Sequence, residues 1–190
     1  MPSNLLGPLI TSKTRLKLLL RFFLNQNLSG YLQGLSKELD ENTNSVRVEL
    51  NRLEEAGLLL AEEQGRRKVY SVNTAHPLTT DLSNMLRKVT GIDQLVDRVV
   101  ARIGDSLQQV LITGALAMGI NSEQLEVTLV GEALDIDYID ELMRKVETLI
   151  EKTITWQVRS SGTEIDSEST LLVWQKMDEQ WPVEVKLPRK

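Results

Sequence analysis

Residues 43–59, TNSVRVELNRLEEAGLL, carry the most specific fold signal in the chain. At about 100° per residue, one side of a helix built from it gathers the apolar residues Val46, Leu50 and Leu53. The opposite side carries Asn44, Arg47, Val48 and Asn51. Gly57 supplies the left-handed position at which helices commonly end. We therefore predict an amphipathic helix over residues 43–56, packed through its apolar side and free on the other.

Two shorter helices are expected upstream of this stretch. In residues 12–25, apolar residues repeat at helical spacing, at Leu16, Leu19, Leu20 and Phe23. Residues 31–39 carry a similar pattern, and Ser29 in front of them suits an N-cap. Residues 25–30 are then expected to form a turn.

A hairpin is expected downstream. Residues 58–63 and 68–73 have the pattern of strands, and the residues between them form a turn signal around Gly65. The predicted tip carries three consecutive cations, Arg66, Arg67 and Lys68. Such a cluster can follow a phosphate backbone or enter a minor groove, although charged turns are also common on protein surfaces.

Three short helices followed by a basic hairpin form the pattern of a winged helix. On the polar side of the third helix, amides suit adenine edges, a guanidinium suits guanine or phosphate, and a small apolar group suits a thymine methyl. The alternative is a small helical core with a solvated basic turn. Because the features occur in order, we expect double-stranded DNA as the partner, contacted by Thr43, Asn44, Arg47, Val48, Asn51, Arg52, Gln64, Arg66, Arg67 and Lys68.

Three strings within residues 12–77 carry a family resemblance: TRLKLL at 14–19, YL at 31–32 and NSVRVELNRLEEAGLL at 44–59. They resemble the winged helix-turn-helix domain of ArsR/MarR-like bacterial transcription regulators. The resemblance implies a homodimer on a symmetric operator. Metal-sensing members use cysteine or histidine ligands, whereas this chain has no cysteine and a single histidine, His76. We therefore expect neither a metal nor a cofactor.

Two amphipathic helices are expected next, over residues 79–90 and 93–103, with Gly91 between them. Their apolar stripes predict a dimer interface made by Leu82, Met85, Leu86, Val89, Leu95 and Val99. The His76-Pro77 step marks the seam before these helices. The expected organisation is a DNA-binding domain, a helical connector and a second domain, at residues 1–77, 78–104 and 105–190.

Beyond residue 105 the pattern alternates between strands and a helix. A helix is expected over 136–151, with strands at 109–113, 125–130, 154–159 and 171–175. The chain as a whole is thus predicted to be α+β, with a winged helix-turn-helix, a helical connector and a small α/β domain. Gly114 and Gly119 follow the first of these strands, but Ile120 stands where a phosphate-binding loop needs lysine, and a dinucleotide loop would need a third glycine.

Residues 105–160 are similar to the nucleotidyltransferase fold of the DNA-polymerase-beta type, in which carboxylates hold two divalent metals. The positions that match this family are Gly114, Ala117 and Gly119. The family's serine, arginine and first aspartate are replaced by Ala115, Met118 and Gln124. Glu126 keeps a carboxylate, while residues 154–158 contain no acid. One glutamate beside an amide cannot neutralise two divalent ions, so we expect no catalytic residues. A generic small α/β domain with a glycine turn is the other interpretation.

Composition limits the remaining classes. The chain has 190 residues with 22 Lys plus Arg and 27 Asp plus Glu, a formal net charge of −5. Residues 1–77 hold 10 basic and 8 acidic side chains, so an acidic total hides a mildly basic first part, and nucleic acid is not excluded. The lack of cysteine excludes disulfides and thiol chemistry. No apolar run approaches the ~18 residues of a membrane span, and no basic flank precedes the apolar stretch at 5–10; we expect a cytoplasmic protein.

These patterns predict a bacterial DNA-binding transcription regulator that acts as a homodimer and carries a non-catalytic regulatory or interaction domain. The alternative is a metal-dependent nucleotidyltransferase that a winged helix targets to DNA. A third possibility is a protein-interaction scaffold whose winged helix no longer binds DNA. Whether a small molecule or a protein serves as effector stays open.

Overall fold

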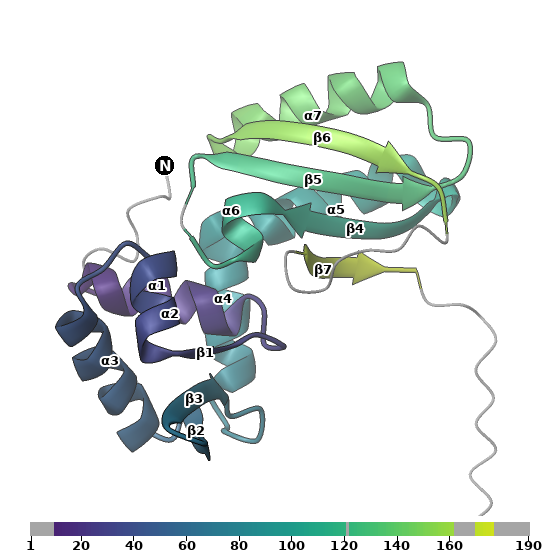
Figure 1. Ribbon diagram of the computed structural model, residues 1–190. Helices are drawn as coiled ribbons and strands as arrows, with labels where there is room; N and C mark the ends of the chain where they lie inside the picture. Colours follow the sequence, from purple (N-terminus) through teal and green to yellow (C-terminus); the bar gives the residue numbers. More distant parts are fainter. Residues whose placement is uncertain (1–9, 121, 162–169, 177–190) are drawn as a thin grey trace, which may run out of the picture.

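The computed structural model describes residues 10–120, 122–161 and 170–176 (Figure 1). The chain is mixed α+β, as expected. Its first part consists of α1 (Lys13–Phe23), β1 (Ser29–Tyr31), α2 (Leu32–Glu38), α3 (Thr43–Glu55), β2 (Leu59–Gln64) and β3 (Arg67–Val72). It continues with α4 (Thr79–Thr90), α5 (Ile92–Ile103), the 3-10 turn η1 (Gly104–Ser106), β4 (Leu107–Thr113), α6 (Gly114–Ala117), β5 (Gln124–Gly131), α7 (Ile136–Ile150), β6 (Thr153–Arg159) and β7 (Thr170–Gln175).

The helix α3 begins and ends where its sequence indicates. The Asn42 side chain caps its first turn, because its Oδ1 accepts the backbone N–H of Asn44 at 2.8 Å. Gly57 follows the last turn with a φ of +73°, in the left-handed region. Val46 and Leu50 are fully buried against α1 and α2. The predicted helix and its packed side are therefore confirmed.

The segment before α2 differs from the expected turn. Ser29, expected as an N-cap, lies in the short strand β1, and Tyr31 occupies the N-cap position of α2 without a side-chain hydrogen bond. β1 pairs antiparallel with β3, with Ser29 opposite Ser71, in a three-stranded sheet of order β1-β3-β2. A three-residue strand is stabilised by its partner strand rather than by local periodicity, so the local pattern did not reveal it.

The hairpin of β2 and β3 is present, and its turn is tighter than expected. Gln64 and Arg67 form the last pair of the ladder, which leaves Gly65 and Arg66 as the turn. Gly65 has a φ of +65°, as a two-residue hairpin turn requires. Arg67 and Lys68 consequently lie on β3 rather than at the tip.

The two connector helices pack inside the protomer. Leu86, Leu95 and Val99 are 0 % exposed, and Leu82, Met85 and Val89 are partly buried against the same core. The helix α4 contacts α1, whereas α5 contacts α7 and the C-terminal sheet. An apolar stripe predicts that a helix face is buried, but it does not indicate which surface covers that face. Here the covering helices and strands belong to the same chain. Leu86, Leu95 and Val99 therefore have no exposed surface to offer a second copy, which corrects the expected interface at these residues.

The C-terminal sheet has the strand order β6-β5-β4-β7. β5 runs parallel to β6, while β4 is antiparallel to both β5 and β7. The helix α7 contacts β6 and α5 contacts β4 and β7, and the two helices lie together along one side of the sheet in Figure 1. The short helix α6 forms the glycine turn between β4 and β5, where the sequence indicated only a turn.

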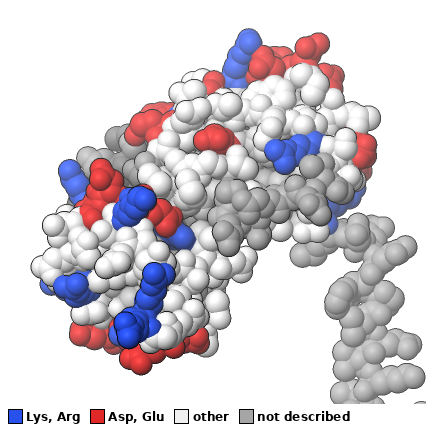
Figure 2. All heavy atoms as spheres, viewed as in Figure 1, with Lys and Arg blue, Asp and Glu red and all other residues white. Residues whose placement is uncertain are grey.

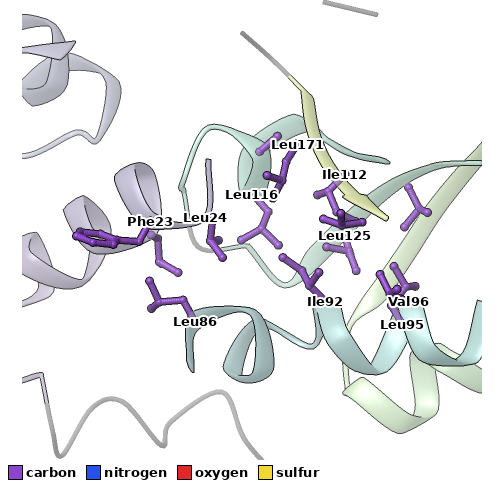
Figure 3. Packing of buried hydrophobic residues seen from close by; sticks show 14 of the residues in the cluster. Phe23, Leu24, Leu86, Ile92, Leu95, Val96, Ile112, Leu116, Leu125 and Leu171 are labelled. Carbon is purple, nitrogen blue, oxygen red and sulfur yellow. The ribbon is translucent and has the colours of Figure 1, made fainter. Parts of the chain in front are cut away.

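One apolar core joins the two parts of the chain. Figure 3 shows Phe23 and Leu24, at the end of α1, close to Leu86 of α4 and Leu116 of α6. At the same junction, Asn25 Nδ2 donates to the backbone oxygen of Thr170 at 3.3 Å. The C-terminal sheet is thus packed directly against the N-terminal helices.

No helix in the described ranges combines the length and the apolar character that crossing a bilayer needs. Residues 162–169 and 177–190, which belong to the predicted second domain, lie outside the described residues.

Candidate nucleic-acid interface

The polar side of α3 is exposed along its length. Asn44, Arg47, Asn51 and Arg52 are all exposed, and Val48 has 42 % of its surface accessible although it is apolar. Thr43 is only half-buried at the start of the helix, where its hydroxyl shares a 2.9 Å hydrogen bond with Ser36 Oγ of α2. Thr43 therefore fixes α3 against α2, while the other predicted residues of α3 form one free surface.

The two arginines of α3 are in different electrostatic states. Arg47 Nη1 donates to Asn44 Oδ1 at 3.4 Å, and no carboxylate of the described residues forms an ion pair with it. Arg52 Nη1 instead lies 3.2 Å from Glu49 Oε1, and Arg15 Nε binds the other oxygen of Glu49 at 2.8 Å. Arg47 is the guanidinium of α3 that is available to an external anion.

Glu49 remains ionised in this arrangement. Burial opposes the charge of its carboxyl, but the hydrogen bond from Arg15 and the charge of Arg52 hold its pKa below the ordinary value. Glu49 is 5 % exposed and lies between α3 and α1. It acts as a structural anion that fixes Arg15 and Arg52, which leaves Arg52 as a marginal candidate for contact with phosphate.

The cations of the hairpin are also distinguished by their neighbours. The guanidinium of Arg67 lies 4.7 Å from the centre of the Tyr31 ring, a cation–π geometry that orients it over α2. Lys68 Nζ forms an ion pair with Glu54 Oε2 at 2.7 Å, and this hydrogen bond raises the pKa of the ammonium group. Arg66, in the turn, is exposed and pairs with no carboxylate in the described part of the chain.

These elements enclose a basic hollow of about 510 Å³ between α2, α3 and the hairpin. Five predicted residues line it, namely Arg47, Asn51, Arg66, Arg67 and Lys68. The remaining five, Thr43, Asn44, Val48, Arg52 and Gln64, lie outside it. Four further residues line the hollow that were not predicted from the sequence, namely Tyr31, Leu32, Gln33 and Tyr70. The signal that could have found Tyr31 is its place directly before α2, but the position of the hairpin over it arises from the β1–β3 pairing.

Unpaired positive charge concentrates in this basic hollow. Among the ten basic residues of residues 1–77, five form ion pairs with described carboxylates, namely Arg15, Lys17, Arg21, Arg52 and Lys68. Of the other five, Arg47, Arg66 and Arg67 line the hollow, whereas Lys13 and Lys37 lie elsewhere. Figure 2 shows basic side chains across the visible face of this lobe, with acidic ones along its lower rim and near its upper edge.

The second candidate site, at the glycine turn of the C-terminal sheet, is dominated by neutral groups. Glu126 of β5 lies against Gly114, where a Cβ would stand 1.9 Å from its Oε1. Gln124 Nε2 donates to Thr155 Oγ1 at 2.6 Å, and Thr155 faces Glu126 across the β5–β6 pair. Within the described ranges, no three Asp, Glu, His or Cys side chains come together as a metal site would require. The arrangement therefore supplies one carboxylate and neutral amide and hydroxyl groups.

No protein-family model and no curated protein matches the chain. Two solved structures are partly similar to it. The structure of reduced HlyU from Vibrio cholerae has 16 % sequence identity and a TM-score of 0.35, covering 44 % of this chain and 82 % of that chain. The transcriptional regulator BldR from Sulfolobus solfataricus has 15 % identity and a TM-score of 0.36, covering 54 % of this chain and 71 % of that chain. At these TM-scores, the interpretation of the site rests on its own geometry.

Proposed function

We propose that the protein is a sequence-specific DNA-binding transcription regulator whose winged helix contacts DNA through the basic hollow. The observation that carries this proposal is the meeting, in one hollow, of the amide of Asn51 with three guanidinium groups that pair with no carboxylate of the described residues, those of Arg47, Arg66 and Arg67. Unpaired cations bind phosphates through the release of counterions, and an amide beside them can read a base edge.

In this proposal, α3 enters the major groove. Val48, an apolar residue with 42 % of its surface exposed, contacts a thymine methyl, while Asn51 and Arg47 read base edges. Arg66 and Arg67 extend from the hairpin to the flanking backbone or the minor groove. Residues 78–190 hold 12 basic and 19 acidic side chains, so their charge is repelled from the duplex and favours a binding mode led by the winged helix.

The test begins with selection of bound duplexes from a random pool, followed by fluorescence anisotropy on the selected site. Arg47→Ala and Asn51→Ala should lower the ratio of specific to random-sequence affinity by about tenfold or more, since one bidentate base contact is worth about 1–3 kcal/mol. Lys37→Ala removes an exposed cation outside the hollow that pairs with no carboxylate in the described part of the chain, and it serves as the matched control. Unchanged discrimination in both α3 variants would overturn the assignment.

We also propose that the C-terminal domain is non-catalytic and that the protein acts as a homodimer. The contact between Glu126 and Gly114 keeps an acid beside the glycine turn, which is the feature that favours the alternative, a metal-dependent nucleotidyltransferase. The neutral Gln124 and Thr155 beside it argue against that alternative, because two divalent ions need several charged oxygens. Nucleotide transfer with Mg²⁺ or Mn²⁺ that disappears in Glu126→Gln would reverse this part of the proposal.

A further inference from the structure

A groove of about 370 Å³ runs between the outer sides of α5 and α7. Its floor includes Leu142 and Val146, which are nearly or fully buried. Arg98 and Arg102 of α5 form one wall. The other wall belongs to α7 and is formed by Tyr138, Glu141, Lys145 and Leu149. The groove is therefore an apolar channel with charged rims, on the side of these helices away from the sheet.

The helix α7 exposes several large apolar side chains to solvent. Of the large apolar side chains that are exposed among the described residues, three belong to α7: Ile136 at 51 %, Tyr138 at 42 % and Leu149 at 46 %. Tyr138, Leu142, Lys145 and Leu149 follow one another at intervals of three and four residues, so they form a single stripe along the groove. Such a stripe is the geometry by which one helix packs against another.

The charges along α7 are arranged in two blocks. Acidic residues occupy its first half, at Asp137, Asp140 and Glu141, and the basic residues Arg144 and Lys145 follow. Glu147, the acid of the second half, is half-buried and accepts the backbone N–H of Ile154 at the start of β6. Two copies of α7 laid antiparallel place the acidic half of each against the basic half of the other. Arg98 and Arg102, which pair with no carboxylate of the described residues, add cations to the same rim. The face is therefore complementary to itself about a two-fold axis.

The ion pairs already present within α7 do not prevent pairing between the charges of two copies. Asp140 pairs with Arg144 and Glu141 with Lys145, each at 2.6 Å and each between highly exposed side chains. Exposed pairs one helical turn apart contribute only about 0.3–0.5 kcal/mol. These side chains can therefore be shared with a second copy at little cost.

We infer that the α5–α7 groove is the docking site for a second copy of this chain, with the two α7 helices antiparallel. The inference rests on the proposed function in one respect, since it locates the homodimer interface of the regulator. It replaces the interface expected on α4 and on the buried side of α5. Figure 1 shows α7 at the opposite end of the molecule from α3, so a dimer joined there holds its two α3 helices apart.

Sedimentation equilibrium of the full chain at micromolar concentration tests the interface. The wild type should be a dimer, and Leu149→Asp should weaken the dimer by at least about tenfold, because a carboxylate would be buried in the groove. Leu172→Asp is the matched control, since Leu172 of β7 is 48 % exposed and lies away from the groove. Tyr138→Ala and Arg102→Glu should weaken the dimer as well, and circular dichroism should show native helix content in each variant.

A wild-type monomer, with or without DNA, would overturn the inference, as would a dimer that Leu149→Asp leaves intact or that Leu172→Asp weakens equally. Binding of Leu149→Asp to a single half-site separates this inference from the proposed function. If this variant binds the half-site with wild-type affinity, the proposed DNA binding does not depend on the dimer interface. If instead the wild type dimerises but binds no duplex, the proposed function is wrong while the dimer interface remains supported.

Discussion

A Cβ on Gly119 would stand 1.9 Å from the Cα of Arg21, which is closer than two non-bonded carbon atoms can approach. The turn after α6 therefore meets the backbone of α1 with no intervening side chain. Gly119 also has a φ of +77°, which side-chain-bearing residues rarely adopt. This contact connects the C-terminal sheet to the helix whose other end, at Arg15, holds Glu49 of α3.

We expect Gly119→Ala to destabilise the protein by about 3 kcal/mol or more, because left-handed strain adds to a clash with backbone that cannot move aside. Urea unfolding followed by circular dichroism measures the loss. Gly65→Ala is the matched control: Gly65 has a φ of +65°, but an added Cβ meets nothing within 4 Å. That variant should lose only about 1 kcal/mol. Equal losses in the two variants would contradict the close contact between α6 and α1.

The ion pair between Arg21 and Glu38 fixes α1 to α2 just beside this contact. Arg21 Nε lies 2.6 Å from Glu38 Oε1, and the arginine side chain is 8 % exposed. Its Nη1 is buried and has no hydrogen-bond partner among the described residues. Glu38→Ala would leave a largely buried cation uncompensated, so we expect a loss of about 2 kcal/mol. Glu55→Ala, at an exposed acid of α3 that has no ion pair among the described residues, should cost less than about 0.5 kcal/mol in the same unfolding measurement.

The sequence predicted best those elements whose signals are local. α3 has its cap at Asn42, its apolar stripe and its terminal glycine within one stretch, and the structure follows all three. The limits of α4, Thr79–Thr90, agree with the expected range for the same reason. By contrast, β1 depends on pairing with β3 about forty residues later, and no local pattern encodes that partner.

The candidate site was predicted in part, for a similar reason. The exposed side of α3 follows from helical geometry alone, so Arg47 and Asn51 could be named from spacing. Which cations stay free could not, because the ion pair between Lys68 and Glu54 joins residues of β3 and α3. The same limit applied to the connector, where the stripe containing Leu86 predicted burial but could not tell an internal partner from a second copy.

Stability should fall steeply in acid through two carboxylates of the first part. Hydrogen bonds from Lys17 and Thr14 lower the pKa of Glu41, and Arg15 lowers that of Glu49 against the opposing effect of burial. A carboxyl whose pKa is depressed in the folded state stabilises the fold above its unfolded value, and this contribution is lost as the pH falls through the folded pKa. We therefore expect the free energy of unfolding to decrease below about pH 4.5.

Glu41→Gln and Glu49→Gln should each reduce stability at pH 7 and flatten this acid limb, because the amide does not titrate. Urea titrations between about pH 3 and pH 7 measure both effects. Glu55→Gln is the control, since Glu55 is an exposed acid of α3 with no ion pair among the described residues. An acid limb of equal slope in all three variants would contradict the role of Glu41 and Glu49.

Relief of the ion pair on Lys68 should strengthen DNA binding, if the basic hollow is the interface. Glu54→Gln would free the ammonium group that Glu54 Oε2 now holds at 2.7 Å. We expect higher affinity for all duplexes. The slope of log K against log salt concentration should become steeper by up to about 0.9, which corresponds to one additional phosphate contact. Glu55→Gln removes the same charge from the adjacent residue without releasing a cation, so a similar gain there would show only a general charge effect.

The turn residue Arg66 provides the complementary test, in which a contact is removed. Its guanidinium is exposed, lines the basic hollow and has no ion pair in the described part of the chain, so it can reach a phosphate without losing an internal partner. Arg66→Ala should weaken binding equally on selected and random duplexes and reduce the salt slope by about one, because phosphate contacts carry no sequence information. Anisotropy titrations at several NaCl concentrations measure both quantities, with Lys37→Ala as the control. A loss confined to the selected sequence would instead place Arg66 at a base edge, and an unchanged slope would remove the hairpin from the interface.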